Sequence, residues 1–159
     1  MRRLICLTFV IFCAVPLLSQ AQREKLPPRD LIQVERKWPN AERTSTGLWT
    51  ELIEPGSGRK PQRGDIVSVL YKGMLLDGTL FDQNLDPDDP FTFQLACGKV
   101  IDGWEFGLLM MQEGEKRRLI VPYEMAYGTR GRAPDIPRMA TLIFEVELLR
   151  IEPPRPLGE

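Results

Sequence analysis

Few residues in this chain are of the types that carry out covalent chemistry. The 159 residues include no histidine, which excludes a Ser-His-Asp triad, a Cys-His pair and histidine-ligated zinc. Cys97 has no histidine to activate its thiol, and we interpret it as a structural or incidental cysteine. The carboxylates Asp86, Asp88 and Asp89 lack the glycine and distal glutamate of an EF-hand loop, so they indicate a solvated turn. We expect neither a metal nor a cofactor.

Aromatic residues are the remaining candidates, because they are spread over six separate segments. They are Tyr71, Phe81, Phe91, Trp104, Tyr127 and Phe144. One buried aromatic residue per element is ordinary for a hydrophobic core, and each of these residues taken alone fits that interpretation. The types of these residues alone therefore do not distinguish a binding pocket from an ordinary core.

The elements that must position these aromatics are expected to be mainly short strands. The 13 glycines and 14 prolines indicate many turns, and the Asp-Gly pair at 77–78 is typical of a hairpin. Apolar residues from Ile101 to Met111 recur at spacings of three, four and three, which predicts one face of a short helix. Strands are expected at 48–53, 66–75, 80–82, 91–95, 116–121 and 142–148. This pattern predicts an α+β fold, with an antiparallel sheet wrapped over one short amphipathic helix.

Residues 1–21 have the features of a secretory signal peptide. A basic start at Arg2 and Arg3 precedes an apolar run, and small residues at Ser19 and Ala21 form a cleavage site. A membrane-spanning helix needs roughly 20 apolar residues, and this run is shorter, which argues against an uncleaved membrane anchor. Cleavage after Ala21 would remove the run, and we expect no membrane span in the remaining chain. We therefore expect an exported protein, either periplasmic or secreted.

Composition places the remaining chain in one globular domain preceded by a charged segment. Apolar residues make up 43% and charged residues 27%, and the formal net charge of −1 argues against a nucleic-acid partner. Residues 22–45 are rich in Arg, Lys, Glu and Pro, which predicts a linker with one helical turn around 30–37. Trp38, in this segment, has no obvious partner. Residues 153–159 are expected to form a flexible tail.

Several sequence blocks resemble the signatures of the FKBP-type peptidyl-prolyl cis-trans isomerases. The blocks are Tyr71–Asp82, Val100–Glu105 with Val-Ile-x-Gly-Trp, Val121–Gly128 with Ala-Tyr-Gly, Ile136-Pro137, and Ala140–Leu149. They occur in the family's order across about residues 46–152, and together they are specific. The resemblance implies an isomerase domain over 46–152, folded as a curled antiparallel sheet around one short helix.

The resemblance also implies a proline-binding pocket at the matching positions. Trp104 would form its floor, while the Ile101 N–H and the Tyr127 hydroxyl would hold substrate carbonyls. Asp82 would orient a nearby group, and a simple turn carboxylate is an equal alternative. The implied catalytic set is Tyr127, Asp82, Ile101 and Trp104, and the substrate-binding set is Tyr71, Phe81, Phe91, Val100, Ile136 and Phe144. Residues expected to pack behind the pocket are Leu52, Val67, Leu119 and Val146.

The implied activity is rotation about X–Pro bonds in exported proteins, which assists their folding. Rotation neither makes nor breaks a covalent bond, so the absence of histidine does not oppose it. The implied partners are proline-containing segments and macrolides such as tacrolimus and rapamycin. The alternative function is a non-catalytic proline-binding chaperone or interaction module. Residues 22–45 are too short for the long dimerisation helix of some relatives, so we expect a monomer.

Two residues depart from the family pattern in the loop expected to overhang the pocket. Arg132 stands where many relatives have histidine, and Asp135 where they usually have isoleucine. Asp135 makes that lip polar, which bears on the subsite for the residue before proline and on macrolide binding. Residues 96–99 also differ from the common family sequence at the pocket rim.

Overall fold

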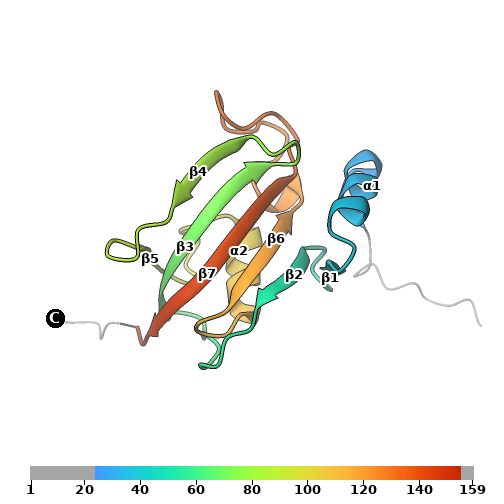
Figure 1. Cartoon of the computed structure of the whole chain (residues 1–159). Helices are drawn as coiled ribbons and strands as arrows, with labels where there is room; N and C mark the ends of the chain where they lie inside the picture. The colour runs from blue at the N-terminus through green and yellow to red at the C-terminus, as the bar shows by residue number, and fades with distance from the viewer. Residues whose placement is uncertain (1–23, 155–159) are drawn as a thin grey trace, which may run out of the picture.

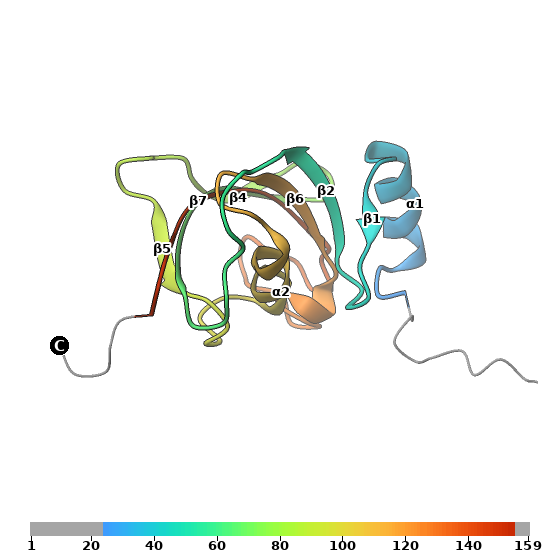
Figure 2. The same cartoon turned by 90° about the horizontal axis from the view of Figure 1, so that it is seen from below.

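One antiparallel sheet curls around a single helix in the computed structural model, which describes residues 24–154 (Figures 1 and 2). The expected signal peptide lies outside these described residues. The strand order is β1-β2-β6-β7-β3-β4, and β5 also pairs with β3. The strands are β1 Glu42–Arg43, β2 Trp49–Glu54, β3 Ile66–Leu75, β4 Leu80–Asn84, β5 Phe91–Gln94, β6 Lys116–Val121 and β7 Leu142–Glu152. The helices are α1 Pro28–Lys37, α2 Asp102–Met110 and the 3-10 turn η2 Tyr123–Met125. The α+β fold class predicted above is confirmed.

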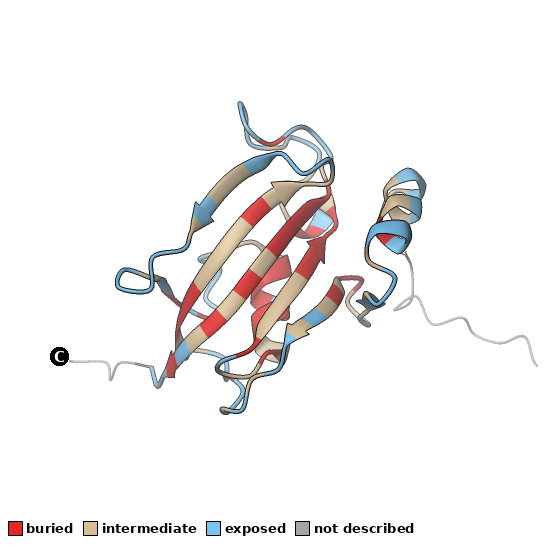
Figure 3. Cartoon of the chain, in the orientation of Figure 1, coloured by how far each residue is buried: buried red, intermediate tan, exposed pale blue. Residues whose placement is uncertain are grey.

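The long strands β3 and β7 form the centre of the sheet. Tyr71 pairs with Val146 and Gly73 pairs with Phe144, so the two strands carry neighbouring pocket candidates. The hairpin predicted at 77–78 joins β3 to β4, and the Gly78 N–H donates to the Leu75 carbonyl at 2.9 Å. Buried residues gather along the central strands and on α2 (Figure 3).

Helix α2 lies under the arch of the sheet and buries the apolar face that the spacing predicts (Figure 2). Trp104, Leu108 and Met111 are all buried in the core cluster. Gly103 permits close packing against β6, because a Cβ atom there would lie 2.4 Å from Val121 Cγ1. Among the described helices, none is long and apolar enough to cross a membrane.

The expectation that Leu52 packs behind the pocket is wrong. Its side chain is 51% exposed, whereas Val67, Leu119 and Val146 are fully buried as expected. Strand β1 pairs with β2 only at Trp49 and Thr50, so Leu52 lies beyond the outer partner strand. The β2–β6 register also shifts between Leu52 and Glu54, and β2 leaves the core at this point.

The linker expected at 22–45 is corrected by the structure, because the described part of it is folded onto the sheet. Helix α1 lies outside the arch, beside β1 and β2 (Figure 2). Its residue Val34 packs with Leu26 from the preceding segment and with Ile120 and Ile143 from β6 and β7. Trp38 has partners after all, because the Arg118 guanidinium lies 5.4 Å from its ring centre. These contacts form a second, smaller hydrophobic cluster on the outer face of the sheet.

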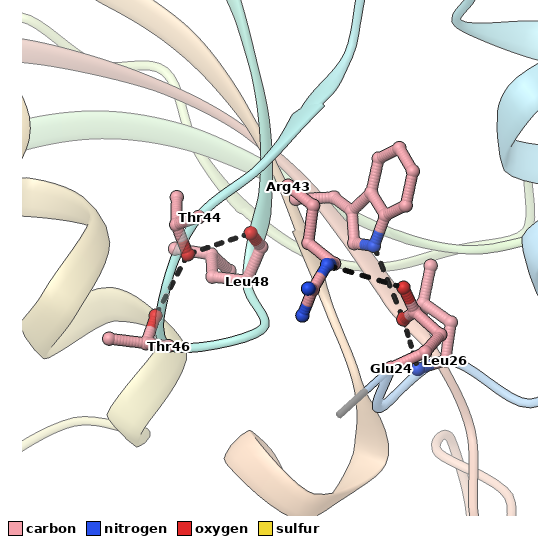
Figure 4. Close-up of polar contacts among 7 residues, drawn as sticks. Glu24, Leu26, Arg43, Thr44, Thr46 and Leu48 are labelled. Atoms are coloured by element: carbon pink, nitrogen blue, oxygen red, sulfur yellow. Dashed lines mark hydrogen bonds and ion pairs between the residues drawn. The ribbon is translucent and has the colours of Figure 1, made fainter. Parts of the chain in front are cut away.

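Polar contacts fix the ends of this N-terminal segment. The Glu24 carboxylate accepts hydrogen bonds from the Leu26 N–H at 2.7 Å and from Trp49 Nε1 at 3.3 Å, and it pairs with Arg43 at 3.6 Å (Figure 4). Asp30, at the start of α1, accepts a 2.6 Å hydrogen bond from the Thr141 hydroxyl. The segment is therefore tied to the sheet at both its apolar and its polar positions.

Substitution Val34→Ala should lower the free energy of unfolding by about 1–3 kcal/mol, because it opens a cavity in a fully buried cluster. Ile32→Ala on the same helix is the matched control, because Ile32 is 65% exposed, and it should change stability by less than about 0.5 kcal/mol. Urea unfolding of both variants measures the difference. Equal stabilities would mean that α1 does not pack on the sheet.

Candidate functional site

A cavity of about 100 Å³ opens between α2 and the inner face of the sheet. Its walls come from five elements and two loops, so residues distant in the sequence meet there. The lining residues are Tyr71, Phe81, Asp82, Phe91, Val100, Ile101, Trp104, Tyr127 and Phe144. These are nine of the ten positions that the resemblance assigned to the site.

Trp104 is the centre of the aromatic wall. It is 4% exposed, and its ring meets Tyr71 at 5.0 Å and Phe144 at 5.3 Å, both edge to face. Phe91 and Phe93 each lie 6.1 Å from it. Edge-to-face contacts set the orientation as well as the separation of the rings. The Trp104 Nε1–H is buried with no hydrogen-bond partner within residues 24–154, so it remains available to a bound group.

Gly73 allows two further rings to meet at the cavity. Phe81 and Phe144 lie perpendicular to each other with their centres 5.6 Å apart. A Cβ atom on Gly73 would lie 2.9 Å from both rings, so a larger residue would displace one of them. The glycine in the middle of β3 is therefore explained by the cavity rather than by a turn.

Tyr71 and Asp82 form the polar edge of the cavity. Burial raises the pKa of the Tyr71 hydroxyl to about 12, and the charge of Asp82 and its hydrogen bond with Tyr71 add to that rise. The Arg132 guanidinium acts in the opposite direction on the pKa of Tyr71. The hydroxyl therefore stays protonated and donates to Asp82 at neutral pH. This contact supports the interpretation in which Asp82 orients a neighbouring side chain.

Glu105 positions the loop that leads into Val100 and Ile101, and sequence reasoning gave it no role. Its buried carboxylate accepts hydrogen bonds from the Ala96 N–H and, at 3.0 Å, from the Gly98 N–H. Ala96 has a φ of 61°, a left-handed conformation that such contacts help to maintain. Because Glu105 follows Trp104 on α2, one helix turn fixes both the pocket floor and this rim. The sequence feature that could have indicated this role is a glutamate directly after Trp104 on a predicted helix.

Ile136 is the one predicted pocket residue that does not line the cavity. It is 2% exposed and packs in the main core cluster. Its N–H and carbonyl both bond to the backbone of Arg132, at 2.8 and 2.9 Å, which anchors the overhanging loop. The side chain thus acts as the loop's attachment to the core.

The other candidate reagents stand apart from the cavity. Cys97 is exposed and does not line it. The side chains of Asn84 and Asp86 accept backbone hydrogen bonds two residues ahead, as in an ordinary solvated turn. No group of three or more Cys, Asp or Glu residues within 24–154 is arranged to hold a metal ion.

The substitution Tyr71→Phe should remove a tyrosine ionisation with a midpoint near pH 12. A raised pKa means that the folded state keeps a proton that the unfolded chain loses near its ordinary value of about 10. The stability from this group is therefore complete below about pH 10 and is lost as pH rises towards 12. Tyrosinate absorbance of the parent and the variant measures the transition. A transition near pH 12 that persists in the variant would assign it to another tyrosine.

Comparison with known proteins gives a consistent family assignment. The sequence model of the FKBP-type peptidyl-prolyl cis-trans isomerases matches residues 57–149. The mouse peptidyl-prolyl cis-trans isomerase FKBP2 is 55% identical over 93 residues, which cover 58% of this chain and 66% of that protein. The chain thus spans slightly less than two thirds of the length of this relative. The FK506-binding protein of Neisseria meningitidis serogroup B is 47% identical over 105 residues, covering 66% of this chain and 96% of that protein.

Solved structures show the same fold. The crystal structure of FkpA from Escherichia coli superposes with a TM-score of 0.71 at 39% identity, covering 80% of this chain and 59% of that one. A peptidyl-prolyl cis-trans isomerase from Pseudomonas syringae pv. tomato superposes with a TM-score of 0.69 at 33% identity, covering 78% and 91% of the two chains. Together with the aromatic cavity, these matches show that the chain belongs to the FKBP-type peptidyl-prolyl cis-trans isomerase family.

Proposed function

We propose that this chain catalyses cis-trans rotation about X–Pro bonds, with the proline ring bound over Trp104. The observation that carries this proposal is a small cavity walled by aromatic rings, three of them within 6.1 Å of Trp104 and edge-on to it. Proline is the residue whose apolar ring is adjacent to the bond that must rotate. Such a cavity holds that ring while leaving the preceding carbonyl at its mouth.

The geometry supports catalysis by positioning and desolvation. Rotation about a peptide bond has a barrier of roughly 18–20 kcal/mol, because amide resonance must be broken. Water favours the planar, more charge-separated amide, so an aromatic cavity that excludes water favours the twisted state. Neither the Ile101 N–H nor the Tyr127 hydroxyl donates a hydrogen bond within residues 24–154, and both are free to hold substrate carbonyls.

The substitution Tyr127→Phe should lower kcat/KM by about two- to tenfold, which corresponds to one lost hydrogen bond, and leave the stability unchanged. Tyr123→Phe is the matched control, because Tyr123 lies outside the cavity and should retain full activity. NMR exchange on an Ala-Leu-Pro-Phe peptide measures the rates. A well-folded protein that binds the peptide without accelerating isomerisation would support a proline-binding chaperone instead.

We propose that tacrolimus and rapamycin bind the same cavity. Relatives from Neisseria meningitidis and Emericella nidulans carry the name FK506-binding protein, and FK506 is tacrolimus. The aromatic floor and walls needed for an apolar ring are present, whereas Arg132 and Asp135 make the overhanging loop polar. Inhibition of the peptide reaction by tacrolimus tests this, and catalysis without inhibition would locate the difference in that loop.

We further propose that the protein is exported as a monomer and assists the folding of other exported proteins. The basic start, the apolar run and the small residues at 19 and 21 support removal of residues 1–21. Mass spectrometry of the protein purified from the producing cell should therefore give a chain that begins at Gln22. A chain that retains Met1 would contradict cleavage, and sedimentation of the same sample would show whether it is monomeric.

A further inference from the structure

The loop over the cavity mouth carries an unusual concentration of positive charge. Residues 129–138 contain three arginines, Arg130, Arg132 and Arg138, but only one acidic residue, Asp135. The chain as a whole has a formal net charge of −1, so this local excess is not a general property of the molecule. The arginine that lies nearest the cavity is the one that a bound peptide would meet first.

Arg132 is the arginine held against the cavity. Its backbone forms two hydrogen bonds with Ile136, whose side chain is buried in the core, so the base of Arg132 is fixed. Its guanidinium carbon lies 5.1 Å from the centre of the Tyr127 ring, and Tyr127 lines the cavity. Stacking on an aromatic face holds a guanidinium in place while leaving its N–H donors at the edge.

The Tyr127 ring is the partner of the Arg132 guanidinium, and no carboxylate among the described residues pairs with it. Arg138, by contrast, donates through Nε to the Thr129 carbonyl at 3.0 Å.

Neither of the two carboxylates near the mouth forms an ion pair with Arg132. Asp82 lines the cavity and accepts the hydrogen bond of Tyr71. Asp135 is exposed on the loop, and among the described residues it forms no ion pair with Arg132. An external carboxylate that reaches Arg132 would therefore form a charge-assisted hydrogen bond without displacing an existing ion pair.

We infer that Arg132 is a specificity-determining residue that favours substrates with aspartate or glutamate immediately before proline. This inference rests on the proposed function, in which the Tyr127 hydroxyl holds a substrate carbonyl beside the proline. The residue before proline supplies the carbonyl of the rotating bond, so its side chain lies next to Tyr127. Arg132 covers that tyrosine, and its planar donors match the two oxygens of a carboxylate.

The test compares tetrapeptides Ala-Xaa-Pro-Phe in which Xaa is Glu, Gln, Leu or Lys, with the purified full protein. Glu and Gln have nearly the same shape, so the ratio of their kcat/KM values isolates the charge. The parent should favour Glu over Gln by about two- to fivefold, the range expected for an exposed ion pair, and Lys should be the poorest of the four. Roughly 0.5 M salt should bring the ratio close to one, because it screens exposed charges.

Arg132→Gln should bring the Glu to Gln ratio to about one or below, since Asp82 and Asp135 then dominate the mouth. Arg36→Gln is the matched control: it removes the same charge from an exposed position on α1, and the parent ratio should persist. An unchanged ratio in Arg132→Gln would overturn the inference. A uniform loss on all four peptides would also overturn it, because Arg132 would then support Tyr127 rather than recognise charge.

The Leu and Gln peptides distinguish failure of this inference from failure of the proposed function. Isomerisation of both, without a preference for Glu, contradicts only the role of Arg132. A folded protein that isomerises none of the four peptides contradicts the proposed function and the inference together.

Discussion

The burial of Trp104 between α2 and the curled sheet is the constraint on which the cavity depends. Its ring touches Tyr71 from β3 and Phe144 from β7, both edge to face, so the helix cannot shift without disturbing two strands. Because Gly103 has no side chain, α2 can pack closely against Val121 of β6. Gly73 leaves the space that the perpendicular rings of Phe81 and Phe144 occupy. Because the rings are rigid and already packed against one another, they cannot close the remaining space, and a cavity survives inside an otherwise tightly packed core.

The proposed rotation about an X–Pro bond makes and breaks no covalent bond, so what the cavity offers is aromatic walls and hydrogen-bond donors. Among the described residues, the buried Trp104 Nε1–H is one such donor without a partner. Two other polar side chains at the cavity or its rim have partners within the chain. Tyr71 donates to Asp82, and Glu105 receives the backbone N–H groups of the neighbouring loop. These internal partners limit the energetic cost of burying polar groups beside the cavity.

The sequence predicted the sheet and the helix, because strand alternation and helical spacing show which side chains face the core. The family blocks predicted the ten site positions, and nine of them line the cavity. The sequence predicted a single helical turn around 30–37, whereas α1 spans Pro28–Lys37 and packs on the sheet. Leu31, Val34 and Trp38 recur at helical spacing, yet the surrounding Arg, Lys, Glu and Pro residues obscured a stripe of only three residues. Ile136 was placed in the cavity because position in a motif does not show on which side of a loop a side chain packs.

The two faces of the sheet are linked through single strands, because neighbouring residues on a strand point to opposite sides. In β7, Phe144 forms a wall of the cavity and Ile143 packs in the cluster under α1. In β6, Leu119 faces α2 while Ile120 faces α1. If β7 paired one residue out of register, its side chains would exchange faces of the sheet. An aliphatic side chain such as Ile143 would then lie where the cavity needs the Phe144 ring. The apolar contacts of α1 therefore favour the register that the cavity requires. A helix outside the family match, which contributes no residue to the cavity, thus packs on β6 and β7, and β7 also carries a cavity wall.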